Sequence, residues 1–172
     1  ENMVVDRSGQ PWNVLRVNAR HAGSSGWSLW NKAAKVAVNK RDPHLRFDPQ
    51  QGWIDLPGGH TKFTIRYSKE HDVYLALCNG VADPTLPTNR SRLSLYKSHD
   101  LQKWDHCTLL LGDDSGLSRQ QAAQSIGFQY VDWQFAGPDI VYLVRTAYGG
   151  AHNFHDANRI TFHRLSNYAR LI

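Results

Sequence analysis

The chain has 172 residues, of which 41% are hydrophobic and 20% are charged. This length allows one domain with its own core, and the composition is that of a globular protein. The net charge of +5 comes from Lys and Arg residues spread along the chain, without the basic runs of nucleic-acid-binding segments. No apolar stretch has membrane-spanning length. We therefore expect neither a nucleic acid nor a membrane as a partner.

Patterns typical of strands recur along the chain, and helical patterns are nearly absent. Residues 62–67 give the clearest case, because Phe63, Ile65 and Tyr67 alternate with polar residues. The expected strands lie at residues 13–18, 35–38, 45–47, 62–67, 73–78, 90–96, 104–111, 128–135, 139–145 and 159–165. Only residues 118–125 favour a short helix. Short strands with tight connections predict an all-β fold of antiparallel meanders.

The strands group into three modules at residues 1–57, 58–116 and 117–172. Each module has room for a four-stranded antiparallel meander, and the period is about 55 residues. The two cysteines, Cys78 and Cys107, lie in apolar strand-like runs. We expect them to be buried free thiols and not a disulfide. They form no metal motif, and the compartment stays open, with a secreted or periplasmic location among the options.

A turn at residues 98–104 reads Ser-His-Asp-Leu-Gln-Lys-Trp. It resembles the Asp-box hairpin of sialidase-like propellers, Ser-x-Asp-x-Gly-x-x-Trp, although it lacks the glycine and is one residue shorter before the tryptophan. Asp100 can cap turn amides while Trp104 packs under the loop. The resemblance implies a β-propeller of sialidase type. Three blades cannot close a ring, so we expect either the C-terminal half of a six-bladed propeller or a half that pairs with a second copy.

Short matches to sialidases follow one another along the whole chain. Tyr130-Val131-Asp132, a turn and a second apolar strand resemble the stretch that carries the nucleophilic tyrosine of that superfamily. Arg90 resembles an arginine on the strand before the Asp-box-like turn. Near the start, Glu1 and Gly9 precede a strand that ends in Asn-Ala-Arg.

Two arginines compete for the last match. Anchoring the comparison on Gly9 selects Arg16, and anchoring it on Asn-Ala-Arg selects Arg20. Both would face the same side of one strand. The position inside the strand favours Arg16.

The resemblance implies a retaining glycoside hydrolase with Tyr130 as nucleophile and Glu1 as its base. Sialic acids carry a carboxylate, which a planar guanidinium binds through two parallel hydrogen bonds. A tyrosine nucleophile is a recognised exception among glycosidases, and a phenol needs a base near neutral pH. The acid/base aspartate and the first arginine of the family belong to earlier blades. This chain therefore holds at most half of such a site, and the sugar and its linkage remain open.

Further polar residues follow the two strands around Tyr130. Asp132 and Gln134 lie on the strand that carries it, and the loop at residues 148–158 adds four candidate sugar ligands, His152, Asn153, His155 and Asp156. This loop is predicted either to join the last and first blades or to bind a sugar. No neighbouring Cys or Glu completes a metal site, so we expect neither a metal nor a cofactor. The alternative to an enzyme is a non-catalytic glycan-binding propeller.

Overall fold

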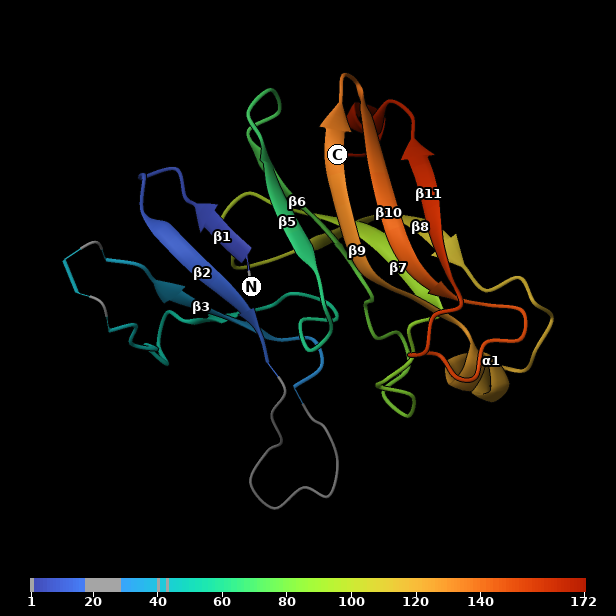
Figure 1. The fold of residues 1–172 in the computed structure, drawn as a ribbon. Helices are drawn as coiled ribbons and strands as arrows, with labels where there is room; N and C mark the ends of the chain where they lie inside the picture. The colour runs from blue at the N-terminus through green and yellow to red at the C-terminus, as the bar shows by residue number, and fades with distance from the viewer. Residues whose placement is uncertain (1, 18–28, 40, 43) are drawn as a thin grey trace, which may run out of the picture.

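The computed structural model describes residues 2–17, 29–39, 41–42 and 44–172 (Figure 1). Within these residues the chain forms eleven strands in three antiparallel sheets, together with one α-helix and one short 3-10 helix. Strands that follow one another in the sequence are neighbours in their sheet. The predictions of an all-β fold and of antiparallel meanders are confirmed.

The first two sheets each have four strands. The first contains β1 (Asn2–Val5), β2 (Pro11–Arg16), β3 (Ala33–Ala37) and β4 (Trp53–Ile54). The second contains β5 (Thr64–Ser68), β6 (Val73–Cys78), β7 (Arg92–Ser98) and β8 (Asp105–Gly112). In both sheets the spatial order of the strands follows the order in the chain.

The third sheet has three strands among the described residues, where four were expected. It contains β9 (Gly127–Ala136), β10 (Asp139–Ala147) and β11 (Arg159–Leu165). The helix α1 (Arg119–Ser125) precedes this sheet, and the 3-10 helix (Tyr168–Leu171) follows it. Ser118 and Gln121 form a capping box at the start of α1, which explains why the predicted helix forms there.

One predicted strand, at residues 45–47, is absent. The backbone there is irregular and its side chains are exposed, so no burial stabilises a strand. The fourth strand of the first sheet is Trp53–Ile54 instead. Phe47 still packs its ring edge-on against Trp53, with ring centroids 5.0 Å apart.

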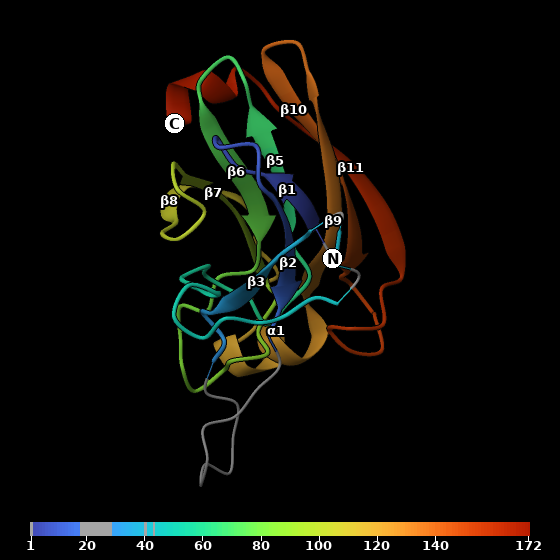
Figure 2. The same cartoon turned by 90° about the vertical axis from the view of Figure 1, so that its left-hand side faces the viewer.

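The first strands of the three sheets lie side by side in the order β1, β5, β9 (Figures 1 and 2). Asn2 links β1 to β5 by accepting from the Ile65 amide at 3.0 Å. Thr64 links β5 to β9 by donating to the Val131 carbonyl at 2.7 Å. At these first strands, side-chain hydrogen bonds thus join neighbouring sheets, whereas backbone ladders join the strands within each sheet.

The middle sheet is buried on both faces. One apolar cluster lies between the first and second sheets and includes Val14, Ile54 and Phe63. A second lies between the second and third sheets and includes Leu77 and Trp133. All six residues of β6 are buried, which explains why this strand reads as an unbroken apolar run.

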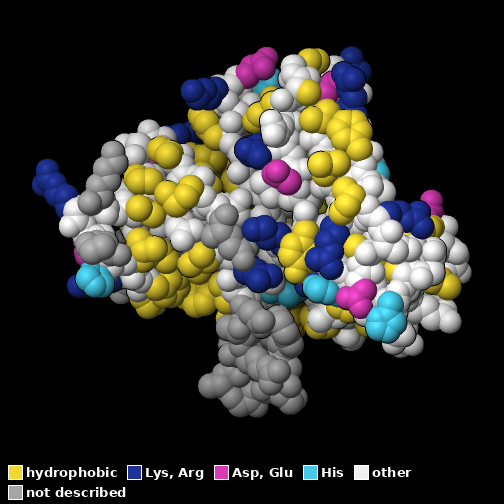
Figure 3. Space-filling view, viewed as in Figure 1, with side chains coloured by type: hydrophobic (Ala, Val, Ile, Leu, Met, Phe, Trp, Pro, Cys, Tyr) yellow, Lys and Arg dark blue, Asp and Glu magenta, His cyan; other side chains and the backbone are white. Residues whose placement is uncertain are grey.

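The two outer sheets each leave apolar side chains exposed. Met3 and Val5 on β1 are 63% and 56% exposed. Leu143 lies opposite Phe162 across β10 and β11, and Ile160 shares their face. These three side chains are 50% to 66% exposed. Figure 3 shows hydrophobic side chains over both flanks of the molecule.

The turn that resembles an Asp box has the expected hydrogen bonds. Asp100 Oδ1 accepts from the backbone amides of Gln102 and Lys103 at 2.7 and 3.0 Å. Trp104 is buried beneath the turn. The hydrogen bonds of Asp100 confirm its predicted capping role. Leu101, in the same turn, takes the left-handed backbone conformation, with φ at 62°; the motif that this turn resembles ordinarily contains glycine.

Candidate functional site

A β-bulge in β9 sets the position of Tyr130. Asp132 pairs with Leu143 and Gln129 pairs with Arg145, so Tyr130 and Val131 together oppose the single residue Val144. The φ of Tyr130 is 53°, in the left-handed region that side chains other than glycine seldom adopt. The bulge interrupts the alternation of the strand, because Gln129 and Val131 are buried while Tyr130 is half-buried. Bulges re-aim side chains and are frequent near active sites.

Arg90 is held beside this bulge by the backbone of β9. Its carbonyl accepts from the Phe128 amide at 2.8 Å, in a parallel bridge with Gly127. Its Nη1 donates to Gln129 Oε1 at 2.5 Å. Arg90 Nε is buried and has no hydrogen-bond partner among the described residues. A buried donor of this kind is rare in proteins.

Arg16, Arg145 and Tyr130 all lie within electrostatic reach of Arg90. Burial lowers the pKa of the Arg90 guanidinium, and the charges of Arg16 and Arg145 lower it further, while Tyr130 acts in the opposite direction. Arg16 ends β2 and is exposed. In Figure 3 the Lys and Arg side chains gather near the middle of the viewed face, with His side chains beside them. This positive region suits an anion.

Tyr130 is enclosed by Arg145 and His155. The guanidinium carbon of Arg145 lies 4.9 Å from the centroid of the Tyr130 ring, which is cation–π geometry. His155 Nε2 lies 3.3 Å from Tyr130 Oη. Arg145 Nη2 donates to the His155 carbonyl at 2.7 Å, so one arginine both covers the tyrosine ring and holds the histidine backbone.

Gln129 fastens the 152–156 segment of the loop to β9. It is 1% exposed, and its Nε2 donates to the carbonyls of Phe154 and His155 at 2.5 and 3.0 Å. Gly127 allows this close approach, because a Cβ at that position would lie 2.2 Å from the Phe154 carbonyl oxygen. The ring of Phe154 in turn faces the Arg90 guanidinium at 5.5 Å. The loop therefore packs against the same residues that hold Tyr130 and Arg90.

The loop is also ordered by its own polar side chains. Asn153 Oδ1 accepts from the amides of His155 and Asp156 at 2.8 and 2.9 Å. Asp156 Oδ2 lies 2.9 Å from His152 Nδ1 and accepts from Asn153 Nδ2 at 2.8 Å. His152, then Asn153 and His155, lower the pKa of the Asp156 carboxyl through these contacts. Asp156 is therefore a hydrogen-bonded carboxylate near neutral pH.

The structure brings some of the predicted site residues together. Arg16, Arg90, Tyr130 and His155 form one group, and Asn153, Asp156 and His152 join it through the loop contacts. Asp132 instead forms an ion pair with Arg66 on β5 at 3.1 Å. Gln134 is exposed on the face of β9 that also carries Asp132. Glu1 and Arg20 lie outside the described residues.

Three residues of this group were not predicted from the sequence: Gln129, Arg145 and Phe154. A signal existed for the first, because Gln129 is a polar residue between the apolar residues Phe128 and Val131 near the start of the strand. The sequence signal for Arg145 was weaker, because an arginine near the end of a strand is usually a surface residue. Phe154 lies among the polar residues of the loop, and nothing in the sequence indicated a separate role for it.

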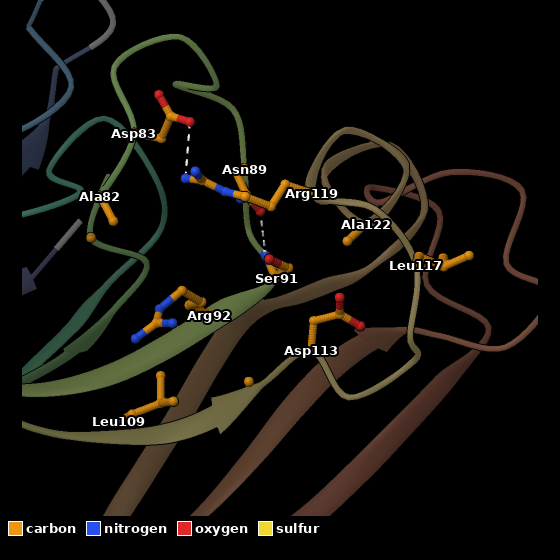
Figure 4. A pocket seen from close by; sticks show the side chains of 12 residues that line it. Ala82, Asp83, Asn89, Ser91, Arg92, Leu109, Asp113, Leu117, Arg119 and Ala122 are labelled. Carbon is orange, nitrogen blue, oxygen red and sulfur yellow. Dashed lines mark hydrogen bonds and ion pairs between the residues drawn. The ribbon is translucent and has the colours of Figure 1, made fainter.

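A separate cavity of about 430 Å³ lies where the 80–91 segment meets α1 and the ends of β7 and β8 (Figure 4). Asp83 and Arg119 form an ion pair across it at 2.9 Å. Arg92 and Asp113 also line it. Its charges are balanced, two positive and two negative, so it lacks the excess positive charge of the Tyr130 region.

No protein-family model matches this chain, and a comparison with curated proteins finds no relative. Among the described residues, no group of three or more His, Cys, Asp or Glu is arranged to hold a metal ion. Within the same residues, no helix is both long and apolar enough to cross a membrane. The functional assignment therefore depends on the geometry and chemistry of the site.

Proposed function

We propose that this chain is part of a sialidase-type glycoside hydrolase that removes a terminal, carboxylate-bearing sugar with retention. Arg16 and Arg90 bind the carboxylate and Tyr130 attacks the anomeric carbon. The observation that carries the proposal is the convergence of these three residues, which come from three different sheets or sheet margins.

The chemistry of the cluster fits an anionic substrate. Guanidinium groups bind carboxylates through parallel hydrogen bonds, and Arg16 and Arg145 lie within electrostatic reach of Arg90, so positive charge accumulates there. Tyr130 is held by a bulge with a strained backbone, which is the kind of local strain that accumulates at functional sites. A phenol attacking beside a carboxylate also avoids bringing a second anion to the reacting carbon.

We further propose that the three sheets are adjacent blades of a β-propeller. The side-by-side first strands and the sequential meanders support this arrangement. The exposed apolar faces at Met3 and Val5 and at Leu143, Ile160 and Phe162 would then pack against further blades. Those blades would supply the acid/base aspartate and the remaining arginine. The resemblance assigns the base to Glu1, which lies outside the described residues.

The test is made on the longest protein that contains this chain, with sialyl and neutral aryl glycosides as substrates. Tyr130→Phe should remove nearly all turnover and leave binding close to wild type, because only the phenol oxygen is lost. Tyr142→Phe, in the core of the same sheet, is the matched control and should retain turnover. Wild-type turnover by Tyr130→Phe would contradict the catalytic role.

Arg90→Lys should weaken binding of the sialyl substrate and spare the neutral one, because a point charge replaces a bidentate fork. Arg41→Lys, an exposed arginine of the first module, is its control. Equal losses on both substrates would mean that the pocket does not select for a carboxylate. Binding without any turnover in the wild type would favour the non-catalytic glycan-binding alternative.

A further inference from the structure

We propose that His155 accepts the proton of Tyr130 during attack and that Asp156 is the positioning residue that orients His155. This inference rests on the proposed function, because it concerns the activation of the same nucleophile. In the resemblance to sialidases that role falls to a glutamate, which would be Glu1. Within the described residues, His155 Nε2 lies 3.3 Å from the phenol oxygen and can accept its proton, whereas the guanidinium of Arg90, which also interacts with Tyr130, has no acceptor.

The three side chains form a continuous chain of contacts. Asp156 Oδ1 lies 3.5 Å from His155 Nδ1, and His155 Nε2 lies 3.3 Å from Tyr130 Oη. A proton on Nδ1 would point to the carboxylate and leave the lone pair of Nε2 facing the phenol. A nucleophile, a base and a third group that orients the base constitute the usual geometry of an activated nucleophile.

The surroundings fix His155 in this position. Its carbonyl accepts from both Arg145 Nη2 and Gln129 Nε2, and its amide donates to Asn153 Oδ1. The backbone on either side of the imidazole is thus tied to β9, to β10 and to the loop itself.

Four charged side chains act on or near this pair, from four segments of the chain. Arg145 lies over the Tyr130 ring, Arg90 interacts with Tyr130 from the segment before β7, and Arg16 on β2 acts on Arg90. Asp156, from the loop, is the carboxylate in contact with the imidazole. The arginines stabilise negative charge that develops on the phenol oxygen, and Asp156 stabilises the imidazolium that forms.

The proton and electron balance of the step is simple. Tyr130 Oη gives an electron pair to the anomeric carbon and its proton to His155 Nε2, while the bond to the leaving oxygen breaks and that oxygen takes a proton from the acid/base aspartate proposed for the further blades. Water then attacks the anomeric carbon from the other side and gives a proton to that aspartate. The bond to Oη breaks, and Oη regains its proton from the imidazolium. The net reaction is hydrolysis.

The experiment compares His155→Gln, Asp156→Asn and Glu1→Gln across pH in the longest protein that contains the chain. We expect His155→Gln to lower kcat/KM by about 100-fold or more, as loss of a general base does, and to abolish the acid limb of its pH profile. In model peptides the pKa of an imidazole lies about two units above that of a carboxylic acid. The pH at which the acid limb of the wild type falls therefore shows whether its base is an imidazole or a carboxylate. Asp156→Asn should lower kcat/KM by roughly 10-fold and move the same limb, since it perturbs only the orientation of the base.

Chemical rescue separates catalysis from folding. Added imidazole should restore at least about a tenth of wild-type turnover to His155→Ala, because the free base occupies the space of the missing ring. His44→Gln removes another exposed histidine that is paired with an aspartate, at 3.3 Å from Asp42, and should leave the profile unchanged. Imidazole should not rescue Tyr130→Phe, which keeps His155 and lacks the nucleophile.

The inference and the proposed function can fail separately. If His155→Gln keeps the wild-type acid limb while Glu1→Gln loses it, His155 is not the base and the tyrosine mechanism stands. If Tyr130→Phe retains full turnover, the proposed function itself fails, whatever His155 does. Absence of imidazole rescue in a folded His155→Ala would also overturn the inference.

Discussion

The Gln129→Leu substitution tests whether one buried amide holds the site together. Leucine has nearly the volume of glutamine, so packing is kept while three hydrogen bonds are lost. These bonds run to the carbonyls of Phe154 and His155 and from the guanidinium of Arg90. A neutral hydrogen bond contributes about 1 kcal/mol and one to a charged group about 2 kcal/mol. The expected loss is therefore about 4 kcal/mol, which is a large share of the stability of an ordinary domain.

The measurement is thermal unfolding followed by tryptophan fluorescence, with urea unfolding as a second readout. For a chain of this size the loss corresponds to a fall in Tm of roughly 8–16 °C. Gln134→Leu is the matched control, because it makes the same change on the same strand at an exposed position, where effects stay within about 0.5 kcal/mol. Equal melting of the two variants would refute the reasoning. Gln129→Glu should fall between them, since it keeps the acceptor for Arg90 and loses both donors.

Four further predictions concern stability, accessibility and association. Gly127→Ala should destabilise the protein and expose the 152–156 segment to proteolysis, because the added Cβ would lie 2.2 Å from the Phe154 carbonyl oxygen; an unchanged digestion pattern would refute the close approach. The hydrogen bonds from Ser8 and Trp12 lower the pKa of Asp6 to about 2, so its stabilisation is present above pH 4 and is lost as the pH falls towards 2. Asp6→Asn should therefore cost about 1 kcal/mol at pH 7, after allowance for solvent exposure, and urea titrations of variant and wild type should converge near pH 2. Burial raises the pKa of the Cys107 thiol to about 11 and raises that of Cys78 as well, so a thiol reagent at pH 8 should titrate no more than one cysteine in the native chain and two in denaturant. The chain expressed alone should self-associate, and Ile160→Ser with Phe162→Ser should reduce its mass in light scattering; a monomeric wild type would contradict a contact role for that face.

Local patterns predicted most of the elements correctly. The alternating run at residues 62–67 became β5, which has one partly exposed face. The unbroken apolar run at residues 73–78 became β6, which is buried on both faces. The turn at Ser98 to Trp104 formed as expected, since its hydrogen bonds join residues only two or three apart. Such features need no knowledge of distant residues.

The features that depend on distant residues were the ones missed. Residues 45–47 have the composition of a strand but find no partner, whereas Trp53–Ile54 is paired by β3. The sequence does not show that Gln129 is buried, because its partners, Arg90 and the carbonyls of residues 154 and 155, lie far away in the chain. Its role depends on contacts across 25 to 39 residues of sequence, which no local pattern records.

The bulge at Tyr130 connects these local and distant effects. A left-handed φ at a bulky residue costs on the order of 1–3 kcal/mol, and nothing in the local sequence favours it, since the position is not glycine. The neighbours on either side offset the cost: Val131 and Trp133 are buried in the core, and Gln129 is held by three hydrogen bonds. Because both flanks are fixed, the extra residue cannot slip along the strand, and the phenol is directed to Arg145 and His155. The position of the proposed nucleophile is thus a consequence of how tightly its neighbours are packed, and weakening those neighbours should disturb the site before it unfolds the sheet.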